Sequence, residues 1–162
     1  MIMSRLLTFL IIFISTKNFS QVPSVSLKST DGKTYRTDSL GFSGPVIFNF
    51  WATWCSPCKK DLSNIFEVYE DWKSETGVTL VAVSIDDQKT ITSVPVYADG
   101  KGWDYVILLD PNGDFKRMMG VNNVPHTFLV NKSGEIVYNH NNYSPGDEEI
   151  LYQELLKLKN DD

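Results

Sequence analysis

Apolar residues are distributed along this chain in two patterns, as compact runs and at helical spacing. Compact runs rich in β-branched and aromatic residues predict buried strands, and three of them lie at residues 46–51, 78–85 and 105–109. Between the first two runs, apolar residues recur every three or four positions, which predicts a helix over residues 56–76. Gly77 follows as a C-cap. Strand, helix and strand in this order predict a right-handed βαβ unit.

The segments on either side of this unit predict two hairpins and further helices. One hairpin covers residues 25–36 around an Asp-Gly turn, and the other covers residues 127–139. An amphipathic helix is predicted at residues 147–158 and a short one at 114–119, whereas residues 86–102 predict a loop or a short helix interrupted by Pro95. We therefore expect an α/β fold with a central mixed β-sheet and helices on both faces.

The first twenty residues have the three-part pattern of a secretory signal. Arg5 precedes an apolar run at residues 6–14, and small polar residues follow it. The run is shorter than the roughly 20 residues that span a bilayer. We expect residues 1–20 to be a signal peptide cleaved after Ser20, and residues 21–162 to form the domain, in the periplasm or outside the cell. An uncleaved leader that anchors the domain to the outer face of the inner membrane is the alternative.

The overall charge argues against a nucleic-acid partner. The formal net charge is −5, and removing the leader takes away Arg5 and Lys17 but no acid, which leaves −7. The sequence contains no basic stripe, so we expect no nucleic acid to bind.

The only two cysteines, Cys55 and Cys58, lie where the first predicted strand turns into its helix. The positive end of a helix stabilises a thiolate, which is the form that attacks a disulfide. This pattern predicts a redox-active pair. A purely structural disulfide over so short a loop would stabilise little. A zinc site would need four ligands, and only His126 and His140 could supplement the thiols. We expect no metal and no cofactor apart from the pair's own disulfide.

Two motifs carry a family resemblance: FWATWCSPCK at residues 50–59 and GVNNVPHTFLV at residues 120–130. With the N-terminal hairpin and the leader, the chain resembles the thioredoxin superfamily, and within it the exported TlpA/ResA-like thiol-disulfide oxidoreductases. The resemblance implies a thioredoxin-like fold with an added N-terminal β-hairpin. It also implies that Cys55 forms a mixed disulfide with a partner and that Cys58 resolves it. Trp54 would flank the site, and Pro57 would shape the turn at the helix start.

The second motif resembles the family's cis-proline segment. Pro125 would be cis and would place the backbone of Val124 beside the cysteines, where a substrate strand can pair with it. Without this resemblance, Pro125 would be an ordinary trans proline before a strand. His126 stands where the family usually has threonine. It either tunes the site or contacts the substrate, or it is a structural histidine.

A further departure concerns the acid that assists the second cysteine. Thioredoxins carry a buried Asp on the strand before the motif, and Asn49 takes that place here. The resemblance to ResA-like proteins implies an acid after the next strand, at Asp86 or Asp87, and favours Asp87. Solvated turn residues are the alternative for both acids.

The resemblance also implies partners and a direction of electron flow. Potentials in this fold extend from about −270 mV in thioredoxin to about −120 mV in DsbA. The Ser56-Pro57 insert predicts a moderately reducing protein, with the pKa of Cys55 below its ordinary value. We expect a monomeric reductase that receives electrons from a membrane thiol carrier and reduces oxidised cysteines in exported proteins, apocytochrome c among them.

Three other functions remain open from the sequence. The first is a disulfide-forming oxidase, and the second is a peroxidase of the peroxiredoxin group, which places threonine and proline ahead of a lone cysteine. The third is a Sco-type metal-binding chaperone, which uses CxxxC and a histidine, a role for which His126 and His140 are the candidates.

Overall fold

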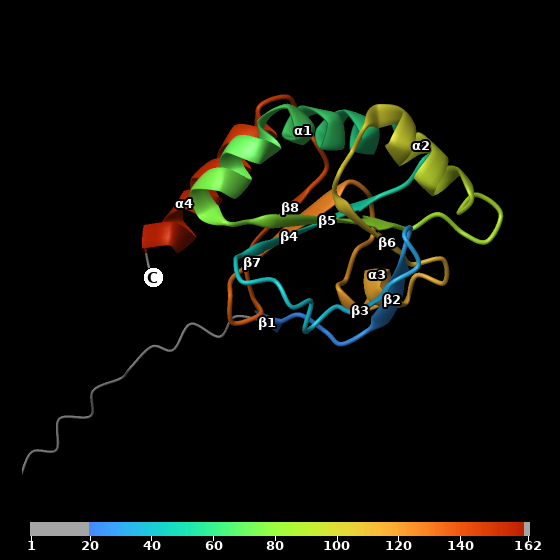
Figure 1. Ribbon diagram of the computed structural model, residues 1–162, viewed down its shortest axis with the longest axis horizontal. Coiled ribbons are helices and arrows are strands. Elements are labelled where there is room, and N and C mark those ends of the chain that lie inside the picture. The colour runs from blue at the N-terminus through green and yellow to red at the C-terminus, as the bar shows by residue number, and fades with distance from the viewer. Residues whose placement is uncertain (1–19, 161–162) are drawn as a thin grey trace, which may run out of the picture.

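A computed structural model describes residues 20–160 of the chain (Figure 1). The predicted leader, apart from Ser20, lies outside the described residues. The strands are β1 Ser20–Gln21, β2 Ser26–Ser29, β3 Thr34–Arg36, β4 Val46–Trp51, β5 Thr79–Ser84, β6 Val106–Leu109, β7 His126–Val130 and β8 Glu135–Asn141. The helices are α1 Ser56–Thr76, α2 Ser93–Lys101, α3 Asp114–Met118 and α4 Asp147–Asn160.

All eight described strands form one mixed sheet in the order β1-β8-β7-β4-β5-β6-β2-β3. Strands β4, β5 and β6 are parallel, and every other neighbouring pair is antiparallel. All six residues of β4 are buried, which explains why this strand is a nearly continuous apolar run rather than an alternating one.

Helices cover both faces of the sheet, as expected for this fold class. Figure 1 shows α1, α2 and α4 on one face and α3 on the other. On the α1 face, alternate residues of β4 such as Ile47 and Trp51 pack against the apolar stripe of α1, which includes Leu62 and Ile65. On the α3 face, Phe48 and Phe50 pack with other aromatic and aliphatic residues around Phe115.

The N-terminal hairpin is present and joins the main sheet. Strands β2 and β3 pair with each other, and β2 also pairs with β6 through Lys28 and Ser29. Strand β1, which the pattern did not predict, pairs with β8.

Helix α1 begins and ends where the sequence predicts. Gly77 closes it with a left-handed φ of 69°, and the Gly77 N–H donates to the carbonyl of Lys73. Pro95 does not interrupt α2, contrary to one of the two predictions for that segment. It lies in the first turn, where backbone N–H groups have no partner within the helix, so the missing N–H costs nothing.

Candidate active site

The two cysteines lie at the junction of β4 and α1 and form a disulfide. Cys55 is the N-cap of α1 in an extended conformation, and the Cys58 N–H donates to Cys55 Sγ over 3.3 Å. Pro57 occupies the first turn, where its fixed φ suits the helix start. Both cysteines are buried, with 6% of Cys55 and none of Cys58 exposed. Cys55 is therefore the sulfur that a partner can approach.

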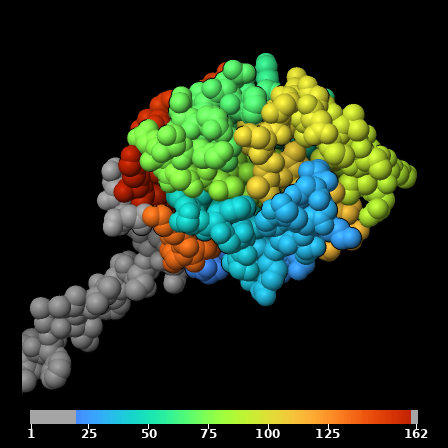
Figure 2. Space-filling model, in the orientation of Figure 1, coloured from blue at the N-terminus to red at the C-terminus, as the bar shows by residue number. Residues whose placement is uncertain are grey.

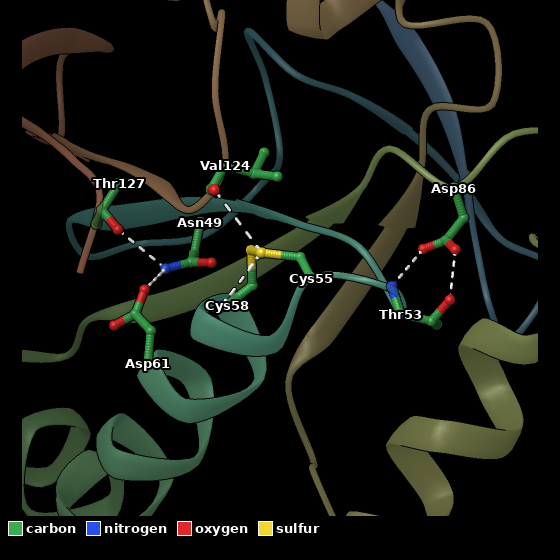
Figure 3. The surroundings of a disulfide bond; sticks show 8 residues. All are labelled: Asn49, Thr53, Cys55, Cys58, Asp61, Asp86, Val124 and Thr127. Atoms are coloured by element: carbon green, nitrogen blue, oxygen red, sulfur yellow. Dashed lines mark hydrogen bonds between the residues drawn. A yellow bond between two sulfur atoms is a disulfide. The ribbon is translucent and has the colours of Figure 1, made fainter.

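Trp54 directly precedes Cys55 in the chain, and the loop before β7 passes beside the disulfide. The Trp54 side chain is 61% exposed. The Val124–Pro125 peptide is cis, as the resemblance implies, and the Val124 carbonyl oxygen lies 3.7 Å from Cys55 Sγ. Figure 3 shows the disulfide between Val124 on one side and Thr53 on the other.

A buried carboxylate holds the turn that precedes Cys55. Asp86 lies two residues after the end of β5 and is fully buried. Its carboxylate accepts hydrogen bonds from the Thr53 N–H over 2.9 Å, from Thr53 Oγ1 over 2.5 Å and from Ser84 Oγ over 2.9 Å (Figure 3). These bonds fix the backbone two residues before the reactive cysteine.

Asp87, the acid that the resemblance favours, is in a different environment. Its side chain is exposed, and its carboxylate accepts hydrogen bonds from the N–H groups of Lys89 and Thr90. The hydrogen bond from Lys89 is the main reason why the pKa of Asp87 is lowered. The buried acid at this point of the chain is Asp86, whereas Asp87 is exposed, and a role of Asp87 at the second cysteine stays a prediction.

A second buried acid, Asp61, lies near the cysteines, and the Asn49 side chain is located between them. The Asn49 Nδ2 group donates to Asp61 Oδ2 over 2.7 Å and to Thr127 Oγ1 over 2.9 Å. The Asn49 amide oxygen is buried without a hydrogen-bond partner, and Figure 3 shows it on the side of the disulfide. Strand β4, helix α1 and strand β7 each contribute one residue, so the network depends on their packing.

Burial has a large effect on Asp61. Only 5% of the residue is exposed, and this desolvation raises its pKa from 3.8 to about 7. The Asn49 hydrogen bond opposes the rise, while the nearby charges of Asp147 and Glu148 add to it. Asp61 can therefore exchange a proton near neutral pH.

Sequence reasoning missed Asp61, although a signal for it was present. It lies three residues after Cys58 and directly before Leu62, on the buried stripe of α1, where a charged residue is unusual.

The two histidines do not meet. His126 is buried and stacks on Phe128 among the residues of the α3 face, and burial lowers its pKa. His140 lies opposite Thr127 on the other face, where its Nε2 is 3.0 Å from Asp147. Across residues 20–160, no group of three or more His, Cys, Asp or Glu side chains is placed to hold a metal ion.

In the same part of the chain, no helix combines the length and the apolar character needed to cross a membrane.

The AhpC/TSA family profile matches residues 20–139. The thiol-disulfide oxidoreductase ResA of Bacillus subtilis is 34% identical over 118 residues, which cover 73% of this chain and 64% of that protein. The chain thus spans less than two thirds of the length of this relative.

Solved structures share the fold. A thioredoxin-like protein from Porphyromonas gingivalis is 48% identical, with a TM-score of 0.77 over 88% of this chain and 94% of its own. StoA from Bacillus subtilis, at 24% identity, has a TM-score of 0.66 over 82% of this chain and 96% of its own. These similarities confirm the predicted fold class.

Proposed function

Because this chain belongs to the AhpC/TSA family and has a thioredoxin-like fold, we propose that it is a thiol-disulfide oxidoreductase acting through Cys55 and Cys58. The observation that carries the proposal is the position of the pair. Cys55 caps a helix, its sulfur accepts the Cys58 N–H, an exposed tryptophan precedes it in the chain, and the Val124 carbonyl lies beside it. This environment stabilises a thiolate on Cys55 when the pair is reduced.

Reduction of a client disulfide proceeds in two exchanges. The Cys55 thiolate attacks one client sulfur, the client S–S bond breaks, and the released client thiolate takes up a proton. Cys58 then loses its proton and attacks Cys55 Sγ, which releases the second client thiolate and forms the Cys55–Cys58 disulfide. Two electrons pass to the client, and a dithiol must supply two more to begin the next cycle.

Asp61 is the group suited to receive the Cys58 proton. A carboxyl with a pKa of about 7 exists in both protonation states near neutral pH. The Asn49 side chain lies between the cysteines and Asp61, with its amide nitrogen bonded to the carboxylate and its oxygen on the cysteine side (Figure 3). The Asn49 side chain thus occupies the space between the buried acid and the cysteine pair.

We place the protein outside the cytoplasm and assign it a reducing role. The leader pattern supports export, and the Ser56-Pro57 insert supports a moderately reducing pair. Its clients would be exported proteins with oxidised cysteines, such as apocytochrome c, and its reductant a membrane thiol carrier.

A trapping experiment tests the activity. In Cys58→Ser the first exchange can occur but the second cannot, so a disulfide-bonded peptide should remain attached to Cys55. Intact-mass spectrometry should show the peptide adduct, which dithiothreitol removes, while Cys55→Ser should show none. Absence of an adduct in Cys58→Ser would refute the assignment.

Direction and the peroxidase alternative need separate measurements. Equilibration of the wild-type pair in dithiothreitol buffers should give a potential nearer that of thioredoxin, about −270 mV, than that of DsbA, about −120 mV. A value at the DsbA end would make the protein an oxidant. Rapid consumption of hydrogen peroxide would instead favour a peroxidase.

A further inference from the structure

The outward face of α2 is apolar and lies directly beside the reactive turn. A groove of about 390 Å³ is lined by Thr53, Ser93, Val96, Tyr97, Gly100 and Lys101. The α2 members recur at helical spacing, so they share one face of the helix. Val96 is 72% exposed, and Thr53 belongs to the turn that leads into Trp54 and Cys55. The groove therefore reaches the turn that leads into Cys55.

Two lysines give this face a positive edge. Lys59 Nζ lies 5.3 Å from the centre of the Tyr97 ring, and Lys101 Nζ lies 5.9 Å from it. The Tyr97 ring also contacts Trp51 and Trp103, which ties α2 to the core. Two ammonium groups at one ring favour an anion, although the chain as a whole carries a net charge of −5.

Cys55 lies between this groove and the Val124 backbone. Figure 3 shows Val124 and Thr53 on opposite sides of the disulfide, and Thr53 is part of the groove. A polypeptide bound at Val124 and joined to Cys55 therefore reaches the face of α2 with the residues that follow.

We propose that the α2 face binds the client segment next to the attacked cysteine and selects an apolar residue followed by an acidic one. The apolar side chain lies on Val96 and Trp54, and the carboxylate faces Lys59 and Lys101. This inference rests on the proposed function, because it names the substrate preference of the same site.

Competition between two cyclic disulfide peptides tests the preference. The peptides are identical except beside one cysteine, where one has Phe-Asp and the other Ser-Lys. Prereduced protein reduces each in a single turnover, and each rate is divided by the rate of the same peptide with dithiothreitol, because flanking charges alter the disulfide itself. We expect the Phe-Asp peptide to react at least about threefold faster, the size of one exposed charge pair, with the charge-dependent part of the preference decreasing in 0.5 M salt.

Two substitutions at exposed positions should abolish the preference. Lys101→Glu reverses one charge at the groove, and Val96→Asp places a carboxylate on its apolar surface. The matched controls on α4 are Lys157→Glu and Ile150→Asp, also at exposed positions. Figure 2 shows α4, in red, at the opposite end of the molecule from α2, in yellow. The controls should keep the full ratio.

An uncharged small disulfide separates the two proposals. Bis(2-hydroxyethyl) disulfide has no flanking residues, so every variant should reduce it at the wild-type rate. Equal corrected rates for both peptides, with this compound still reduced, would overturn the groove assignment and leave the oxidoreductase proposal intact. Failure to reduce any of the three disulfides would overturn the oxidoreductase proposal. A change in sedimentation of Val96→Asp with unaltered peptide rates would assign the face to a second copy of the chain and overturn the inference.

Discussion

Replacing Asp61 by asparagine should stabilise the oxidised protein at alkaline pH and have progressively less effect as the pH falls. The substitution keeps the shape of the side chain and an oxygen that accepts the Asn49 hydrogen bond, but it removes the charge. The folded protein holds the Asp61 proton more tightly than the unfolded chain does, because burial raises the pKa from 3.8 to about 7. Between these values the folded state binds more protons, so wild-type stability contains a component that falls as the pH rises.

The size of the effect follows from the two pKa values. The difference between 3.8 and about 7 corresponds to about 4 kcal/mol at full ionisation, since each pKa unit is worth about 1.36 kcal/mol. Asp61→Asn carries none of this cost. Its free energy of unfolding relative to wild type should therefore rise by up to about 4 kcal/mol between pH 4 and pH 8 and change little above that.

Urea unfolding of the two oxidised proteins at pH 4.5, 6, 7 and 8.5, followed by tryptophan fluorescence, measures this difference. Asp71→Asn is the matched control, because it removes a carboxylate from an exposed position of the same helix. A difference between Asp61→Asn and wild type that stays constant with pH would refute the reasoning. So would a carboxyl carbon resonance of Asp61 that does not titrate between pH 5.5 and 8.5.

Two further predictions concern the turn before Cys55 and the core. Asp86→Asn replaces one carboxylate oxygen by an N–H₂ group that cannot accept from Thr53 or Ser84, so the free energy of unfolding should fall by about 1–3 kcal/mol. Thermal unfolding measures it, and an unchanged midpoint would contradict a holding role for Asp86. Leu155→Ala removes a fully buried side chain of α4 and should cost about 2–5 kcal/mol in urea unfolding while leaving the redox potential unchanged.

Much of the fold could be predicted from local patterns. Strand β4 and helix α1 have the predicted bounds, because an apolar run buried on both faces and a long amphipathic stripe ending in glycine are strong signals. Helix α2 was the least certain prediction, because it buries only Val94 and Ala98 and therefore shows little periodicity. Pro95 suggested an interruption, but a proline in the first turn of a helix is tolerated. Strand β1 has only two residues, too few for any periodicity to be visible.

The acids of the site show the limit of local reasoning. Asp86 and Asp87 are neighbours just after β5, where the chain passes from the interior to the surface, so that Asp86 is buried and Asp87 is exposed. A one-residue uncertainty in strand end is common, and here it exchanges a buried carboxylate for an exposed one. The sequence named both acids, and only the fold distinguishes them.

Local sequence patterns were enough to place the cysteine pair at the start of a helix. The spacing of Cys55 and Cys58, the strand before them and the amphipathic helix after them are all local features. The tertiary structure alone decided the surroundings of the pair. Asn49 and Asp61 are 12 residues apart and Asn49 and Thr127 are 78 apart, so only strand pairing and helix packing bring them together. Burial then sets the pKa of Asp61, because desolvation depends on every element that covers the carboxyl group.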